Sequence, residues 1–481
     1  MSSRSPSRSP PKSALLHGTP TSSTILLDIP LSIALAQHPS APDLTKPFHL
    51  PLSVPAVSEP YPSTEPKSAK ARQRVVERLG DNGTAVVDEA WIQDELEAVT
   101  GVHTGLWCLA RRLVPELAGK EGRTRKRKKD DGQEEDGSTE LSEKEDTTMG
   151  LGQFSGNSGP EPIQEPCLRL SSIGEHSWEV ARYDPNPLML LAGGMMPCEH
   201  LFAKEVGNRL ISNLSRSTIC LTLGLSSRMD DGSPTYTLPP LSSFLLSTIG
   251  SMFIKAFSES AFTMLPRHSK SAGPGQFDFV LLDPPWENRS VRRSKQYQTM
   301  ERRNGDIDPV IALEGILGQH IAPNGLVGLW ITNKASVREK AFRLFESWDV
   351  TLEQEWVWLK VTTNGEPVTE VGGLWRKPYE VLLLGRKTSG DETDKTMVDA
   401  VTGGNKTVNR KLIIAVPDLH SRKPSLKELI EPMMPDPRSY RALEIFARHL
   451  TAGWWAWGDE CLRYNWTGYW SSNNSDSPVT L

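Results

Sequence analysis

Asp283, Pro284, Pro285 and Trp286 (DPPW) combine residue types that can hold a planar amine. They follow the apolar run 277–282 (FDFVLL), so Asp283 is expected where a buried strand ends. The two prolines fix φ and cannot continue a helix or a strand ladder, so we expect backbone carbonyls to be left unpaired. A carboxylate, a free carbonyl and a flat indole can accept both N–H groups of an exocyclic amine and stack on its ring. The alternative is an ordinary proline-rich turn that the aspartate begins.

Holding both N–H groups would draw the nitrogen lone pair out of conjugation and aim it at an electrophile. The site then has to position two groups for an in-line displacement, which requires no metal. The five cysteines are scattered without a CxxC pair. Cys198, Glu199 and His200 come nearest to a metal pair, but no second ligand pair accompanies them. We therefore expect reduced thiols and no metal site.

Basic residues crowd the stretch after DPPW. Residues 287–303 (ENRSVRRSKQYQTMERR) carry six basic side chains against two acids, although the whole chain has a net charge of -5. A basic patch beside the strand end can attract phosphates of a polynucleotide, but such contacts do not identify its sequence. The alternative is a solvated loop. The residues expected to contact the substrate are Asn288, Arg289, Arg292, Arg293 and Tyr297.

From residue 241 onwards, apolar strand-like runs alternate with amphipathic helical segments. This alternation predicts an α/β domain with a mostly parallel sheet covered on both faces. In such sheets ligands bind outside the carboxyl ends of the strands. Trp454, Trp455 and Trp457 are expected to pack in the core rather than form a stacking platform. The expected strands are FLLSTI, FDFVLLD, LVGLWITN, EWVWLKV, YEVLLLG, KLIIAVPD and ALEIFAR, and the expected helices are DPVIALEGILGQHIA, VREKAFRLFESW and SLKELIEPMM.

The rest of the chain divides by composition. Apolar residues three and four apart in RQRVVERL, DEAWIQDELEAV and GLWCLARRLVPEL predict helices. The mean hydropathy is -0.40, no apolar run reaches membrane-spanning length, and the N-terminus lacks the apolar core of a signal peptide. The predicted parts are a disordered Ser/Pro-rich tail (1–70), a helical accessory segment (71–120), a charged linker (121–165), a smaller mixed α/β accessory region (166–240) and a catalytic domain (241–481).

The blocks DPPW, ENRSVRRSKQY, LWITNK, EWVWLKV, KPYEVLLLGR, LHSRKPSL and LEIFARHLTAGWWAWGDE cover most of residues 237–465. Together they resemble the MT-A70 family of adenine-N6 methyltransferases, and within it the branch named methyltransferase-like protein four. The resemblance implies a permuted Rossmann-like domain that uses S-adenosylmethionine as methyl donor, with the catalytic strand before the cofactor-binding strand. A search for the glycine-rich GxG signature of standard methyltransferases would not find this chain.

The resemblance also implies roles for single residues. Asp283 and Pro284 would orient the amine, Pro285 would stiffen the turn, and Trp286 would stack on the base. Two positions depart from the family pattern: Asp459 replaces the usual Asn, and Thr248 replaces the usual Asp. Each departure puts the strength of cofactor binding in question. The residues implied to bind the cofactor are Lys423, Glu444, Arg448, Asp459, Glu460, Thr248 and Ile249.

The implied activity is methyl transfer to adenine N6 in RNA, with a 2′-O-methylated adenosine of small nuclear RNA as the favoured target. Two alternatives stay open: a DNA adenine-N6 methyltransferase, and a catalytically silent RNA-binding subunit of a methyltransferase complex. The expected partner is small nuclear RNA or another nucleic acid, with no membrane contact. A monomer is expected, with a partner chain left open. Residues 123–129 (RTRKRKK) favour a nuclear location over the cytosol.

Overall fold

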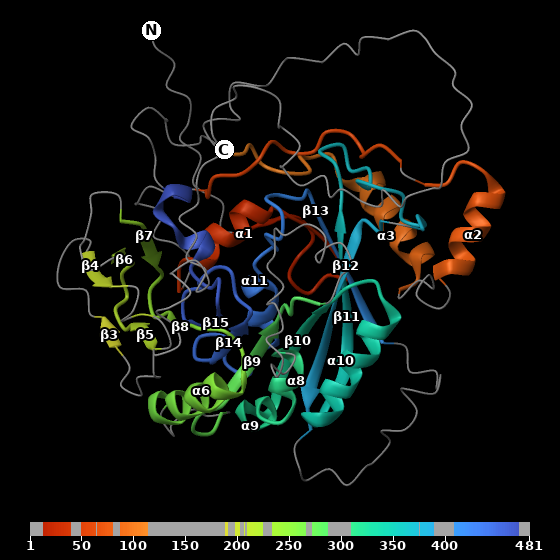
Figure 1. Ribbon diagram of the computed structural model, residues 1–481. Helices are drawn as coiled ribbons and strands as arrows, with labels where there is room; N and C mark the ends of the chain where they lie inside the picture. Colours follow the sequence, from red (N-terminus) through yellow and green to blue (C-terminus); the bar gives the residue numbers. More distant parts are fainter. Residues whose placement is uncertain are drawn as a thin grey trace, which may run out of the picture.

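The protein is described by a computed structural model (Figure 1). The structure describes residues 13–39, 50–63, 65–79, 87–113, 188–190, 198–202, 206, 209–224, 233–265, 272–286, 309–374, 376–388 and 408–470. None of the helices in this part of the chain is both long enough and apolar enough to cross a membrane.

A large mixed sheet forms the centre of the described structure. It has twelve strands in the order β1-β2-β13-β11-β12-β10-β9-β14-β15-β8-β5-β3. In its middle, β8, β15, β14, β9 and β10 are parallel neighbours. The predicted α/β class with a mostly parallel sheet is therefore confirmed. The bounds are Leu15–His17 (β1), Thr24–Leu27 (β2), Leu188–Leu190 (β3), Leu210–Asn213 (β5), Ser243–Leu246 (β8), Phe277–Leu282 (β9), Ile321–Ile331 (β10), Val350–Lys360 (β11), Tyr379–Lys387 (β12), Asn409–Ala415 (β13), Ala442–Ile445 (β14) and Trp454–Gly458 (β15).

Helices cover both faces of the sheet, as expected for parallel strands that are apolar on both sides. One core cluster joins side chains of α3, α6, α8, α9 and α10 to one face, and a second joins α1 and α11 to the other. Along β9, Val280 and Leu282 belong to the first cluster and Phe279 and Leu281 to the second. The helices are Ile29–Ala36 (α1), Ala69–Leu79 (α2), Glu89–Val102 (α3), Ser251–Met264 (α6), Pro309–Glu314 (α8), Leu317–His320 (α9), Ala335–Ser347 (α10) and Lys427–Ile430 (α11).

The predicted disorder of residues 1–70 is wrong for the described part of that segment. Strand β2 pairs in parallel with β13, and Ile25, Leu26 and Leu27 are fully buried. Asp28 then starts α1: its side chain accepts the Leu31 N–H at 2.9 Å, as an N-cap residue does. Composition averaged over a long Ser/Pro-rich stretch conceals this short strand and helix. Residues 1–12 lie outside the described part.

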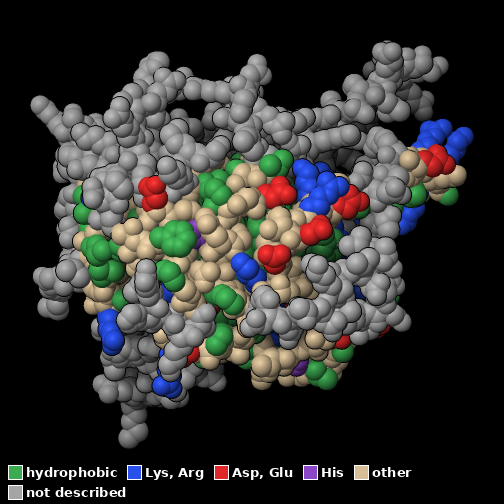
Figure 2. Space-filling view, turned by 90° about the horizontal axis from the view of Figure 1, so that it is seen from below, with side chains coloured by type: hydrophobic (Ala, Val, Ile, Leu, Met, Phe, Trp, Pro, Cys, Tyr) green, Lys and Arg blue, Asp and Glu red, His purple; other side chains and the backbone are tan. Residues whose placement is uncertain are grey.

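Of the helices predicted in the accessory segment 71–120, two are present and one is not. Helices α2 and α3 are present, and α2, exposed over most of its length, protrudes at the right of Figure 2. The helix predicted over GLWCLARRLVPEL is absent from its described part, residues 105–113. There the Arg111 guanidinium donates to the carbonyls of Val54 and Val416, and Arg112 donates to that of Leu50. These contacts with distant segments hold the backbone extended, and apolar spacing gives no sign of them.

The sheet also crosses the predicted boundary at residue 241. Strand β5 pairs antiparallel with β8, and β3 extends the sheet beyond β5. A separate sheet contains β4 (Cys198–Phe202), β6 (Ile219–Gly224) and β7 (Thr235–Leu238). The predicted accessory region thus continues the central sheet on one side. The predicted linker 121–165 lies outside the described residues.

The predictions for the C-terminal tryptophans were right, and those for two helical segments were not. Trp454 and Trp457 are buried, at 3% and 1% exposure, so their predicted core role is confirmed. Helix α6 was not predicted; only four residues separate it from β8. The long helix predicted over DPVIALEGILGQHIA is two short helices, α8 and α9, which the glycine-containing stretch between them separates.

We predict that Asp28→Ala destabilises the protein. Asp28 is 2% exposed and accepts two backbone N–H groups, those of Leu31 and Leu109, each at 2.9 Å. Losing a helix cap and leaving a buried donor unpaired should lower the free energy of unfolding by about 2–4 kcal/mol. Urea denaturation measures this loss. Asp436→Ala is the control and should change little, because it lies in a surface turn where the Asp436 side chain accepts the Arg438 N–H and the backbone bond from Ser439 stays intact. Equal midpoints for both variants would contradict the cap role.

Candidate active site

Charged side chains from three parts of the sequence meet at one edge of the sheet. Parallel strands place their carboxyl ends together, and Asp283 directly follows β9 while Glu444 lies near the end of β14. These strands are neighbours, with Leu281 opposite Glu444. Arg448 follows β14, and Lys423 comes from the loop after β13. The site is thus assembled from distant segments at the edge where α/β sheets bind ligands.

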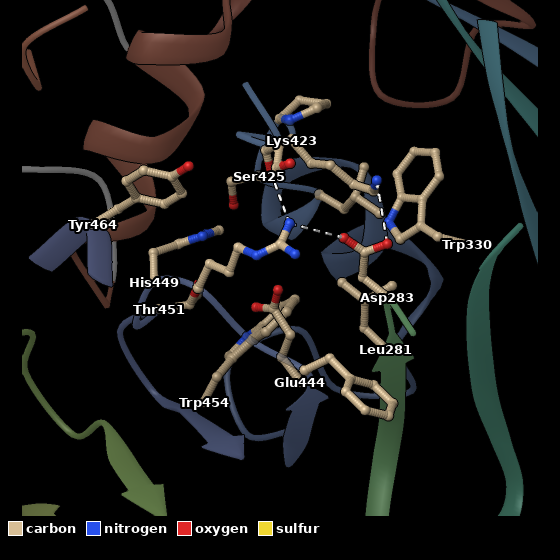
Figure 3. A pocket seen from close by; sticks show the side chains of 15 residues that line it. Leu281, Asp283, Trp330, Lys423, Ser425, Glu444, His449, Thr451, Trp454 and Tyr464 are labelled. Atoms are coloured by element: carbon tan, nitrogen blue, oxygen red, sulfur yellow. Dashed lines mark hydrogen bonds and ion pairs between the residues drawn. The ribbon is translucent and has the colours of Figure 1, made fainter. Parts of the chain in front are cut away.

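A pocket opens at this edge; together with the open solvent at its mouth it encloses about 470 Å³ (Figure 3). Asp283 and Glu444 point into it from neighbouring strands, and Lys423 faces them. Two residues around it, Ser421 and Phe446, have positive φ values of 65° and 61°. Strained backbone of this kind often occurs at functional sites. The lining residues are Leu281, Asp283, Trp330, Ser421, Lys423, Pro424, Ser425, Leu426, Glu444, Phe446, Arg448, His449, Thr451, Trp454 and Tyr464.

Lys423 sits between two carboxylates. Its Nζ lies 3.2 Å from Asp283 Oδ1 and donates to Glu380 Oε2 at 2.7 Å. Glu380 also accepts a hydrogen bond from Lys360 Nζ at 2.6 Å. On the other side of Asp283, Arg448 Nη1 lies 4.0 Å from Oδ2. The Asp283 carboxylate is therefore flanked by two cations, one near each of its oxygens.

These charges shift the acidity of the pocket residues. Burial by itself would raise the pKa of Glu380, but Lys360 and Lys423 outweigh burial and hold that pKa well below its usual range. Burial opposes charge on Lys423 too, yet Asp283 and Glu380 raise its pKa. In contrast to Glu380, the pKa of Glu444 is raised: burial and the neighbouring Asp283 shift it from 4.5 to about 8. Near neutral pH, Lys423 is thus charged and Glu444 is largely protonated.

The DPPW corner differs in one respect from its prediction. Pro284 is buried, Pro285 is exposed, and Asp283 and Trp286 are half-buried. The Pro284 carbonyl is not unpaired, because it accepts the Trp286 backbone N–H at 2.8 Å. The chain bends tightly enough after the prolines for this short-range bond to form. A carbonyl has two lone pairs, so the oxygen can still accept one further N–H. The Trp286 indole donates to the Trp330 carbonyl at 2.8 Å, which fixes the ring.

The other predicted cofactor residues lie around the pocket but do not line it. Thr248 and Ile249 follow β8, where Thr248 is half-buried and Ile249 belongs to the core. Asp459 and Glu460 follow β15, and Glu460 reaches the pocket indirectly by accepting a hydrogen bond from Arg448 at 3.1 Å. The predicted substrate residues Asn288, Arg289, Arg292, Arg293 and Tyr297 lie outside the described residues.

Sequence reasoning gave no role to four residues at the site. Glu380 is the second residue of β12, which runs antiparallel to β10 and β11, so the first residues of β12 lie at the same edge of the sheet as the carboxyl ends of those strands. That signal was available from the pattern of strands. Trp330 lies near the end of β10, and the centre of its ring is 5.0 Å from Lys423 Nζ. Ser421 and Tyr464 had no sequence signal, since only the tertiary fold brings them to the pocket.

Together, this α/β sheet and its edge pocket of paired charges define a Rossmann-like domain of the methyltransferase class. A family model described as MT-A70 matches residues 277–460. The chain belongs to the MT-A70 family, whose members are adenine-N6 methyltransferases that use S-adenosylmethionine as methyl donor, and the predicted family is confirmed. No cluster of metal-binding side chains occurs among the described residues.

Three relatives show how far the similarity extends. The chain is 42% identical over 197 residues to the N6-methyladenosine RNA methyltransferase MTA1 of Cryphonectria parasitica, covering 40% of this chain and 54% of the relative. It is 33% identical over 284 residues to MTA1 of Pyricularia oryzae, covering 57% and 67%. It is 35% identical over 244 residues to the human N(6)-adenine-specific methyltransferase METTL4, covering 50% and 46%. The matched part thus spans about half to two thirds of each relative.

The pocket residues fit the polar groups of S-adenosylmethionine. Lys423 and Arg448 are cations that suit its carboxylate. The Thr451 hydroxyl, a buried atom in the lining, has no hydrogen-bond partner among the described residues, and the Glu444 carboxyl lines the same pocket. Both can bond to ribose hydroxyls or to an amino group. Polar atoms that are buried without partners are costly, and a ligand would satisfy them.

We predict that Glu444 makes the ligand-free protein less stable as pH rises. Its pKa is about 8 in the folded state and 4.5 in the reference state, so over this range the unfolded chain binds fewer protons than the folded one. Stability should therefore decrease from about pH 5 to pH 8. Glu444→Gln removes the titration and should flatten the dependence of Tm on pH, whereas Glu346→Gln on the exposed side of α10 should not. An unchanged slope in Glu444→Gln would refute the assignment.

Proposed function

We propose that the protein transfers a methyl group from S-adenosylmethionine to N6 of adenine in RNA. The observation that carries the proposal is the Asp283 carboxylate at the carboxyl end of β9, facing a pocket between Lys423 and Arg448. The family supports the reaction, and the printed names of the two MTA1 relatives support RNA as the substrate. The narrower target, a 2′-O-methylated adenosine of small nuclear RNA, rests on the resemblance to one branch of the family.

Asp283 and Pro284 have complementary roles in this reaction. The Asp283 carboxylate can accept one N–H of the amine, and the Pro284 carbonyl can accept the other. These two hydrogen bonds would hold the base and free the nitrogen lone pair for attack. Lys423, 3.2 Å from Asp283 Oδ1, would hold this carboxylate in position to accept. Bound S-adenosylmethionine supplies an electrophilic methyl group. Attack by the nitrogen would release S-adenosylhomocysteine, and the Asp283 carboxylate, which accepts from the amine, would take the proton that the nitrogen loses.

The remaining site residues complete the proposal. Lys423, Glu444 and Arg448 would hold the cofactor directly, with Glu460 fixing Arg448. Thr248, Ile249 and Asp459 would border it. Trp286 would stack on the base, and Pro285 would keep the turn rigid. Residues 241–481 would supply the catalytic centre, together with the N-terminal segments that pack on it, and the basic run 123–129 favours action in the nucleus.

The first test is Asp283→Ala. Without the carboxylate, one N–H of the amine loses its acceptor, and methyl transfer should decrease by at least about a hundredfold. Cofactor affinity should change little, because Lys423 keeps its ion pair with Glu380. Methyl transfer is measured on matched RNA and DNA oligomers, and S-adenosylhomocysteine binding is measured by calorimetry, with Asp436→Ala as control. Full activity in Asp283→Ala would rule out this role for the carboxylate.

The same measurements separate the alternatives. A relative from Caenorhabditis elegans is named a DNA N6-methyl methyltransferase, so DNA is the second candidate substrate. Preference for the DNA oligomer would overturn the choice of RNA. A catalytically silent RNA-binding subunit is the third possibility, favoured by the departures at Thr248 and Asp459. Absence of cofactor binding and of methyl transfer in the purified protein would support that reading.

A further prediction concerns the loop after DPPW. Replacing Arg292 and Arg293 with Ala should weaken nucleic-acid binding, because two phosphate contacts are lost. The slope of log Kd against log salt should decrease by about 1.4 for a single strand. Binding is followed by fluorescence anisotropy over a salt series. The double variant Lys340→Ala/Arg343→Ala, on the exposed side of α10, removes the same charge elsewhere and should keep the slope. If the two double variants behave alike, the loop does not contact the substrate.

A further inference from the structure

Arg422 is a buried cation next to the pocket, with no role assigned so far. It is 2% exposed and lies in the chain between Ser421 and Lys423, which both line the pocket. Its Nη1 donates to Asp418 Oδ2 at 2.9 Å and to the Leu52 carbonyl at 2.8 Å. A charged group is rarely buried so completely without a pairing partner, and its position is correspondingly well defined.

Two aromatic rings hold the same guanidinium. Its Cζ lies 4.5 Å from the ring centre of Tyr464 and 5.2 Å from that of Tyr469, within range of cation–π attraction. Nε and Nη2 have no hydrogen-bond partner in the described part of the chain. Attraction to one carboxylate and two rings therefore fixes the group. A lysine could keep the charge and donate both hydrogen bonds here, but it has no planar guanidinium to pack against the two rings.

The carboxylate that pairs with Arg422 is held from the N-terminal part of the chain. Residues 50–54 and 109–113, here called the strap, lie against the loop 418–423. Asp418 is fully buried at its side chain, lies 3.6 Å from Arg111 Nη1 and accepts the Ser53 hydroxyl at 3.3 Å. The Leu52 N–H donates to the Tyr469 carbonyl at 2.8 Å. The strap thus contacts Arg422 and Asp418 at three points: the Leu52 carbonyl, the Ser53 hydroxyl and the Arg111 guanidinium.

On its other side the loop orders the pocket. Ser421 is held at a φ of 65°, a conformation that needs support from its surroundings, and its carbonyl accepts Arg448 Nη1 at 3.3 Å. Lys423 reaches Asp283 and Glu380. A shift of residue 422 would therefore move both neighbours, and with them the two pocket cations.

We propose that Arg422 is a positioning residue that links the strap to Lys423 and Arg448, so that the N-terminal strap helps to form the cofactor pocket. The inference rests on the proposed function, because it assumes that these two cations bind the cofactor. A purely structural Arg422 would contribute to stability alone. A positioning Arg422 acts on cofactor affinity, and it acts through Lys423.

A double-mutant cycle distinguishes these two roles. In the full-length chain, Arg422→Lys should weaken S-adenosylhomocysteine binding about tenfold, and in a Lys423→Ala background the same change should weaken it less than about twofold. Val350→Ala, a buried position at the amino end of β11, is the stability control: it should lower Tm and leave affinity unchanged. Calorimetry gives the affinities and thermal unfolding gives Tm.

A second variant approaches the cluster from the strap. Arg111→Lys loses the paired bonds to Val54 and Val416 and does not touch the pocket, so it should weaken binding in the same direction, and again less in the Lys423→Ala background. Equal effects in both backgrounds, or wild-type affinity in the folded variants, would overturn the inference. Absence of binding by the unmodified chain would count against the proposed function instead, which keeps the two failures distinct.

Discussion

The ion pair between Lys423 and Asp283 is the interaction on which the site depends. The Asp283 oxygens are held at the pocket by two cations: Lys423 Nζ lies 3.2 Å from Oδ1, and Arg448 Nη1 lies 4.0 Å from Oδ2. Lys423 itself is buried, and Asp283 and Glu380 raise its pKa against the effect of burial, so it stays charged. In the neighbouring Glu444, burial and the charge of Asp283 raise the pKa to about 8. Near neutral pH the Glu444 carboxyl is therefore largely protonated and can donate as well as accept a hydrogen bond.

That ion pair depends on segments far from it in sequence. Lys423 lies on a loop whose buried part is anchored by Asp418 and Arg422, and these contact residues near the N-terminus. Strand β2 pairs with β13, the strand that leads into this loop. The N-terminal segments thus contact both the strand that leads into this loop and the loop itself. A division into an unfolded tail and a separate catalytic domain therefore does not describe this chain.

The central strands were predictable because they are buried on both faces and so appear as unbroken apolar runs. Phe277–Leu282 has all six residues buried, and the acid that follows it was correctly placed at the sheet edge. The N-terminal strand and helix were missed because Ser and Pro around them dominate the composition. The helix predicted over GLWCLARRLVPEL does not form in its described part, residues 105–113. There, hydrogen bonds from Arg111 and Arg112 to distant carbonyls outweigh the local preference for helix. Contacts of this kind leave no local pattern, which is also why Arg422 could not be assigned beforehand.

The missing glycine signature has a structural explanation in the turn after β14. Standard nucleotide-binding turns use glycine to adopt unusual backbone angles and to allow close approach. Here Phe446 itself takes a φ of 61°, and the close approach comes from Gly458 at the end of the neighbouring strand. A Cβ on Gly458 would lie 3.3 Å from backbone atoms of both Phe446 and Ala447. The glycine that packs this turn is therefore brought in by β15 rather than by the turn's own sequence. Because the two strands are parallel neighbours, the tight corner next to the Glu444 carboxyl needs no glycine-rich motif.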